Sequence, residues 1–164
     1  MRTIILPGYS AHNRAWADEI AAELAGGEVH DWPHWESGGT FDATRELAAI
    51  KNRIGDDTVH LLAKSIGCRI AAQIVLDRAE QIDRLMLCGL PTTQVEAQAD
   101  FAAALSRLPV KRILVVQNRH DPYASHAEVQ NMIQSIHPGV KVVEGDRADH
   151  HYPYPKIFRE FFEH

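Results

Sequence analysis

The sequence predicts a single α/β domain over residues 1–164, a three-layer α/β/α sandwich with a mostly parallel sheet of about six strands. Short apolar runs alternate with amphipathic helical patterns along the chain, as in successive βαβ units. The apolar runs are nearly continuous, which is typical of strands buried on both faces. The length of 164 residues suits one domain with its own core.

The first part of the chain predicts two strands and two helices. Residues 2–6 are apolar and β-branched, and residues 13–25 follow with apolar side chains at helical spacing until two glycines end the pattern. A short strand is predicted at 28–31. A proline and two glycines predict a loop at 32–40, and helical spacing of apolar residues predicts a second helix over 41–54.

The rest of the chain repeats the alternation. An apolar run at 59–63 predicts a buried strand, and a helical pattern begins directly after Ser65. Proline residues follow two of the later helices and mark their ends. The remaining elements are strands at 82–87, 112–117 and 140–143 and helices at 94–108, 124–136 and 154–162.

Ser65 carries the strongest functional signal in the chain. It lies in the turn A-K-S-I-G (63–67), between the strand at 59–63 and a helix with apolar residues on one face. A small-x-Ser-x-Gly turn between a strand and a helix is the context of a nucleophile elbow. The turn lifts the serine oxygen above the sheet, and the helix N-terminus favours developing negative charge. Without this context, Ser65 would be only a helix N-cap.

Asp121 and His150 are the candidate partners of Ser65, because a serine nucleophile needs a base and a carboxylate that orients the base. Asp121 follows the strand at 112–117, and the proline after it fixes the turn; alternatively, it is a turn residue or a helix N-cap. His150 lies in the polar loop before the last helix, and the adjacent His151 is its rival. All these candidates follow strand ends, where ligands bind in parallel sheets.

Two backbone N–H groups are the candidate oxyanion hole. One belongs to Ile66, directly after the nucleophile, and the other to Tyr9 in the loop after the first strand, although that loop can also be a plain turn. Trp32 and Trp35 follow the second strand, where they form either an apolar wall for substrate or a packing loop at the sheet edge. Tyr123, close to the candidate acid, is the third substrate-binding candidate.

At these residues the chain resembles the α/β-hydrolase superfamily, and it is most similar to small, lid-poor bacterial serine hydrolases related to the retinoblastoma-binding serine hydrolase family. The resemblance spans almost the whole chain and implies Ser65 as nucleophile, Asp121 as acid and His150 as base. It also implies the strand order 2-1-3-4-5-6, with the elbow strand at the centre. It rests on L-P-G-Y-S (6–10), A-K-S-I-G (63–67), H-D-P-Y (120–123) and A-D-H-H-Y (148–152).

Two departures from the family pattern matter. Ala63 stands where glycine is commoner in the elbow, which is a mild change because alanine is the next smallest residue. The chain is also too short for the family's usual first strands and for a lid after the fourth strand. We therefore expect an open, shallow site with modest selectivity.

The expected function is hydrolysis of small esters or thioesters, as by a carboxylesterase, through an acyl-enzyme on Ser65. Two alternatives remain open: a non-catalytic binding module on the same fold, and acyl transfer to an alcohol or amine. The expected partner is therefore a small-molecule ester or thioester. The sequence does not predict the oligomeric state.

Composition excludes several other classes. The formal net charge of −5 disfavours nucleic acid as a partner. Phosphate-binding loops, HExxH and cysteine pairs are missing from the sequence, so neither a cofactor nor a metal is expected. No apolar run reaches the roughly 20 residues that span a bilayer, and no targeting segment is recognised, so no membrane partner is expected. Cys68 and Cys88 are expected to be buried and reduced in a cytoplasmic protein, and Lys64 to lie at the surface.

Overall fold

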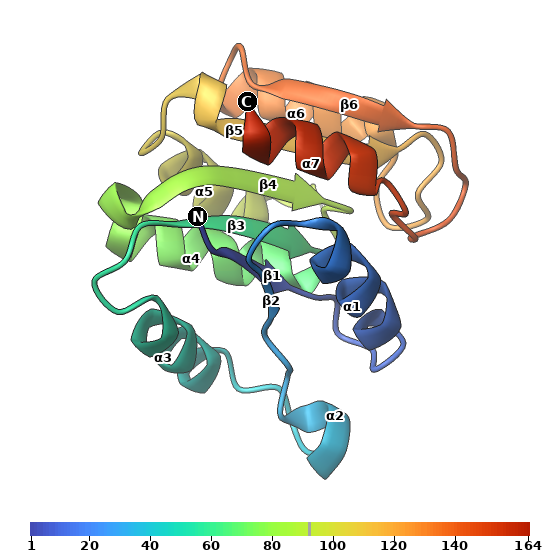
Figure 1. Cartoon of the computed structure of the whole chain (residues 1–164). Coiled ribbons are helices and arrows are strands. Elements are labelled where there is room, and N and C mark those ends of the chain that lie inside the picture. Colours follow the sequence, from blue (N-terminus) through green and yellow to red (C-terminus); the bar gives the residue numbers. More distant parts are fainter. Residues whose placement is uncertain (92) are drawn as a thin grey trace.

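The structure, a computed structural model, describes residues 1–91 and 93–164. Its centre is a parallel sheet in the order β2-β1-β3-β4-β5-β6 (Figure 1), which confirms the predicted fold class and strand order. The strands of the described residues are β1 (Thr3–Leu6), β2 (Gly27–Val29), β3 (Val59–Lys64), β4 (Ile82–Cys88), β5 (Ile113–Asn118) and β6 (Lys141–Gly145).

Helices cover both faces of the sheet and complete the predicted three-layer sandwich (Figure 1). One face, which buries Trp16 and Phe158, is covered by α1 (Asn13–Glu23) and α7 (Pro155–Glu163). The other face buries Phe101 and is covered by α3 (Ala43–Ile54), α4 (Ile66–Arg78), α5 (Val95–Leu105) and α6 (His126–Ile136). None of the helices in the described ranges is long and apolar enough to cross a bilayer.

The structure adds one helix to the prediction, and capping hydrogen bonds explain the later start of two others. The predicted loop after β2 contains one helical turn, α2 (His34–Ser37). Helix α3 begins later than predicted, because Asp42 accepts a hydrogen bond from the N–H of Arg45 and caps the helix. Helix α6 begins after Ser125, because Ser125 and Glu128 form a reciprocal capping box.

The register of the sheet places the carboxyl ends of the strands at one edge. Leu6 at the end of β1 pairs with Ala63, and Lys64 at the end of β3 pairs with Cys88 at the end of β4. The last residues of β5 and β6 also pair with each other. The loops that carry the site candidates therefore leave the sheet side by side.

Both cysteines are buried and free, as predicted. The thiol of Cys68 donates to the carbonyl oxygen of Ala63 over 3.4 Å, and that of Cys88 does so over 3.3 Å. Burial raises the pKa of Cys88 to about 12, so its thiol stays protonated at neutral pH. These residues therefore pack as small apolar side chains beneath the sheet edge.

Candidate active site

Ser65 adopts a strained backbone conformation at the junction of β3 and α4. Its φ of 55° and ψ of −120° make it the one non-glycine residue with positive φ in the described part of the chain. Its N–H donates to the carbonyl of Cys88 over 3.1 Å, and its own carbonyl accepts from Cys68 over 2.9 Å. An added Cβ on Gly67 would overlap the carbonyl oxygen of Leu6, so only glycine lets α4 begin against the end of β1.

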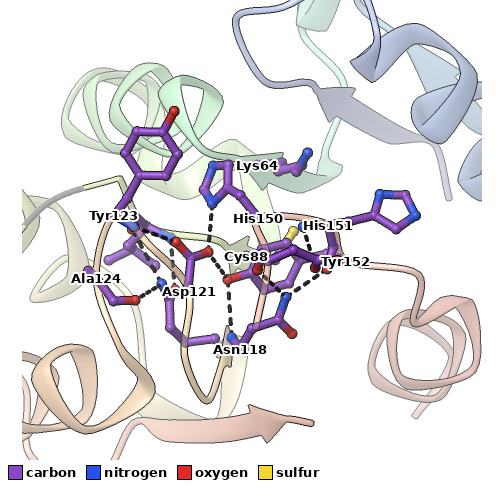
Figure 2. A network of polar contacts seen from close by, with 12 residues as sticks. Lys64, Cys88, Asn118, Asp121, Tyr123, Ala124, His150, His151 and Tyr152 are labelled. Carbon is purple, nitrogen blue, oxygen red and sulfur yellow. Dashed lines mark hydrogen bonds and ion pairs between the residues drawn. The ribbon is translucent and has the colours of Figure 1, made fainter. Parts of the chain in front are cut away.

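A buried carboxylate lies in the loop after β5. Asp121 Oδ2 accepts hydrogen bonds from His150 Nδ1 and from the Tyr152 hydroxyl, each over 2.6 Å, and Oδ1 accepts from the N–H of Tyr123 over 2.9 Å (Figure 2). Burial alone would raise the pKa of Asp121, but these hydrogen bonds outweigh it and hold the pKa below its ordinary value. Asp121 is therefore an ionised acceptor at neutral pH.

The bond to Asp121 fixes the tautomer of the neutral His150 ring. Since a carboxylate can only accept, Nδ1 carries the proton and Nε2 is left as an acceptor. Nε2 is buried and has no hydrogen-bond partner among the described residues. The ring packs on Gly89, where an added Cβ would lie 3.0 Å from its Cε1, and Gly89 directly follows Cys88, to which Ser65 is bonded. The His150 ring therefore packs against the residue that directly follows β4.

The structure distinguishes the two adjacent histidines. Figure 2 shows His150 directed at Asp121, whereas the side chain of His151 extends away from it. Asn118 fixes this arrangement, because its Nδ2 donates to the carbonyls of Asp149, over 2.9 Å, and of His151, over 2.7 Å. The loop is thus held on both sides of His150.

Gln117 joins two further loops at the site. It is fully buried, its Oε1 accepts from the N–H of Leu90 over 2.8 Å, and its Nε2 donates to the carbonyl of Ala124 over 2.7 Å. The loop after β4 is thereby tied to the loop that holds Asp121. The prediction from sequence missed Gln117 and Asn118. Two amide side chains at the end of an apolar strand nevertheless indicate buried groups that form hydrogen bonds.

Trp32 supports the loop after β1. Its indole is 1% exposed, and its Nε1 donates to the carbonyls of Pro7 and Gly8, each over 3.1 Å. Because a peptide is planar, the N–H of Tyr9 points away from the Gly8 carbonyl and hence away from Trp32. No acceptor for this N–H is found among the described residues. Contact of Trp32 with a substrate stays a prediction.

Aromatic side chains border the same loop. The carbonyl of Tyr9 accepts from His34 Nε2 over 2.7 Å and from Trp35 Nε1 over 2.8 Å. Tyr9 and Tyr123 are 52% and 65% exposed. The ring of Tyr123 lies against that of His150, tilted by 55° with 4.6 Å between the ring centroids. Tyr9 and Tyr123 therefore stand at the rim of the edge that carries Ser65.

Lys64 is buried, so the prediction of a surface lysine is wrong. Its side chain leaves β3 on the face that α1 covers, because it is two residues after the buried Leu62. Lys64 is 5% exposed, its Nζ donates to Asn13 Oδ1 over 2.5 Å, and it lies 5.3 Å from the centre of the Trp16 ring. Burial lowers the pKa of Lys64.

His30 and His34, near the end of β2, have separate hydrogen-bond partners. His30 Nε2 pairs with buried Glu46 over 2.7 Å, while His34 binds the loop after β1. Across residues 1–91 and 93–164, no group of three or more histidine, cysteine, aspartate or glutamate side chains is arranged to hold a metal ion.

The parallel sheet and the strained Ser65 turn at the carboxyl end of β3 are those of an α/β hydrolase. A model of the serine hydrolase family matches residues 3–152. The chain therefore belongs to the serine hydrolase family, which confirms the resemblance at superfamily level. The narrower likeness to retinoblastoma-binding serine hydrolases stays a prediction.

Similar solved structures share the fold. A putative YdeN-like hydrolase from Pectobacterium atrosepticum has a TM-score of 0.69 at 19% identity, over 99% of this chain and 90% of that one. A serine hydrolase homologue from Coxiella burnetii gives 0.67 at 19% identity, over 98% and 82%. A lidless serine hydrolase from Xanthomonas campestris gives 0.68 at 16% identity, over 99% and 79%. No curated protein matches the sequence.

Proposed function

We propose that this serine hydrolase cleaves small esters or thioesters through Ser65, His150 and Asp121. The observation that carries the proposal is the 2.6 Å bond between Asp121 and His150, which leaves a buried Nε2 without a hydrogen-bond partner among the described residues. The strained backbone of Ser65, at the start of α4, supports Ser65 as the nucleophile. Acyl transfer requires a base that a carboxylate orients and that takes the proton of the serine hydroxyl.

The reaction runs in two halves. Nε2 of His150 takes the proton of Ser65 as its Oγ attacks the substrate carbonyl, and the same proton passes to the leaving alcohol or thiol when the acyl-enzyme forms. In the second half, His150 takes a proton from water, hydroxide adds to the acyl carbon, and Ser65 recovers its proton. Asp121 stabilises the imidazolium in both halves without becoming protonated.

The N–H groups of Ile66 and Tyr9 hold the oxyanion in this proposal. Ile66 is the first residue of α4, so its N–H has no carbonyl partner within the helix and adds to the positive helix end. Tyr9 contributes the second donor because Trp32 holds the preceding carbonyl on the opposite side. Loss of one such donor typically lowers the rate about 10²–10³-fold.

The experiment is intact-mass spectrometry after treatment with a fluorophosphonate probe, with Ser65→Ala beside the wild type. We expect one adduct on the wild type and none on Ser65→Ala, with the same circular dichroism for both proteins. Hydrolysis of p-nitrophenyl acetate and of a short acyl thioester should disappear in parallel. An adduct that persists in Ser65→Ala, or a folded wild type without any adduct, would overturn the proposal.

A further inference from the structure

We infer that Lys64 is a positioning residue, which acts through Asn13 to hold the oxyanion loop, residues 7–10, against the Ser65 turn. This inference rests on the proposed function, since it assigns the N–H of Tyr9 a place in catalysis. Lys64 itself does not touch the reacting atoms.

Two hydrogen bonds make the connection. Lys64 Nζ donates to Asn13 Oδ1 over 2.5 Å, and Asn13 Nδ2 donates to the carbonyl of Ser10 over 2.9 Å. Lys64 immediately precedes Ser65, and Ser10 immediately follows Tyr9. The bridge therefore joins the residue before the nucleophile to the residue after the second oxyanion donor.

The cation sets the orientation of the carboxamide. An ammonium group can only donate, so Oδ1 of Asn13 must face Lys64, and Nδ2 is then directed at the carbonyl of Ser10. The carboxamide also packs on Gly8, where an added Cβ would lie 2.7 Å from both Nδ2 and Oδ1. With Trp32 bonded to the opposite side, the loop is held between two side chains.

Stability alone is a poor explanation for this lysine. A buried ammonium loses most of its hydration. In return, Lys64 gains one short hydrogen bond, to Asn13, the contact with the Trp16 ring and weaker attraction to the carboxylates of Asp121 and Asp149. Burial lowers its pKa, which is the sign of that cost. An apolar side chain of similar length would pack on Trp16 without the cost, so the charge is better explained by the bond that it makes.

The test compares Lys64→Met, Asn13→Ala and the double variant in hydrolysis of p-nitrophenyl acetate. We expect kcat to fall about 10–100-fold in each, with KM within about twofold, because the loop acts on the transition state. The double variant should lose no more than the worse single variant, because both changes break one bridge. Asn13→Asp keeps the acceptor for Lys64 but not the donor to Ser10, and it should lose kcat as well.

The matched control is Lys51→Met, which removes a lysine bonded to Asp77 over 2.8 Å on the outside of α3 and α4. It should keep full kcat. Full kcat in Lys64→Met, additive losses in the double variant, or a rise in KM alone would overturn the bridge. The last result would make Lys64 a substrate contact.

Hydrogen exchange of residues 8–11 provides a readout that does not depend on turnover. Exchange should be faster in Lys64→Met and Asn13→Asp than in the wild type and Lys51→Met, and equal rates would overturn the inference. Asn13→Asp keeps the test available if Lys64→Met does not fold, because aspartate suits the first turn of α1. A wild type that does not react with the fluorophosphonate would contradict the proposed function. An active wild type with an equally active Lys64→Met would contradict only the inference about Lys64 and Asn13.

Discussion

At the scale of single residues, three hydrogen-bond donors keep the buried carboxylate of Asp121 ionised. Its side chain is fully buried and accepts from His150, Tyr152 and a backbone N–H, so the site contains a charge that the protein, and not water, solvates. The hydroxyl of Tyr152 also accepts from the N–H of Asn118 over 3.1 Å. Tyr152 therefore links the acid to the end of β5.

Tyr152→Phe should lower both activity and stability. The pKa of Asp121 lies below its ordinary value in the folded protein, so its contribution to stability is present above that ordinary pKa, near 3.8, and is lost as the pH falls through the lowered value. Without the hydrogen bond from Tyr152, the pKa of Asp121 is lowered less. We expect the free energy of unfolding to drop by about 1–3 kcal/mol at neutral pH and the difference from wild type to narrow below about pH 4.

Urea unfolding at several pH values measures this effect, and Tyr154→Phe is its matched control. Tyr154 donates its hydroxyl to Asn118 Oδ1 over 2.5 Å but does not touch Asp121. The stability that Tyr154→Phe loses should therefore be similar at all pH values. A loss in Tyr152→Phe that does not change with pH would contradict the account.

The sequence predicted Asp121 as the candidate acid and favoured His150 as the base, with His151 as a rival that no local pattern excluded. Adjacent side chains point in different directions, and which one meets Asp121 depends on where Asn118 holds the loop. That clamp joins residues more than 30 positions apart, so no local pattern reveals it.

At the scale of elements, apolar runs and helix stop signals predicted the strands and long helices to within a few residues. The surroundings of Lys64 were not predictable in this way. The strand pattern gives the face from which the side chain leaves, but the cover comes from α1, whose Trp16 and Asn13 enclose it. The packing of distant elements therefore decided whether this lysine is exposed.

Gly67→Ala tests the junction of α4 with β1. The added methyl would overlap the carbonyl of Leu6, a backbone atom that cannot rotate away, so we expect a loss of about 1–3 kcal/mol in stability and a large loss of activity. Gly39→Ala is the control, because its methyl would meet only the Ser37 hydroxyl, at 3.2 Å. Thermal unfolding and ester hydrolysis measure both variants, and a stable, active Gly67→Ala would contradict the crowded junction.

At the scale of the whole molecule, one parallel sheet accounts for the site. The alternation of strands and helices was enough to predict that the candidate loops share an edge, because parallel strands end together. The connection from β4 to α5 covers only residues 89–94, so no inserted domain lies between them.

The open, shallow site that we expect from the sequence predicts a weak dependence of activity on acyl length. A fully buried methylene adds about 0.8 kcal/mol, which is about fourfold in kcat/KM, but an uncovered site buries only the first few. We expect kcat/KM to level off between p-nitrophenyl butyrate and hexanoate, with Ser65→Ala as the blank. A fourfold rise per methylene continuing to decanoate would contradict an open site.

The placement of the tryptophans has an optical consequence. The chain has three tryptophans, and the indole N–H of each donates to a backbone carbonyl at the edge that carries Ser65. Trp16 binds the carbonyl of Tyr152, while Trp32 and Trp35 bind the loop after β1. The tryptophan fluorescence of the protein therefore originates from side chains that are bonded to these loops, and it can report their movements without an added label.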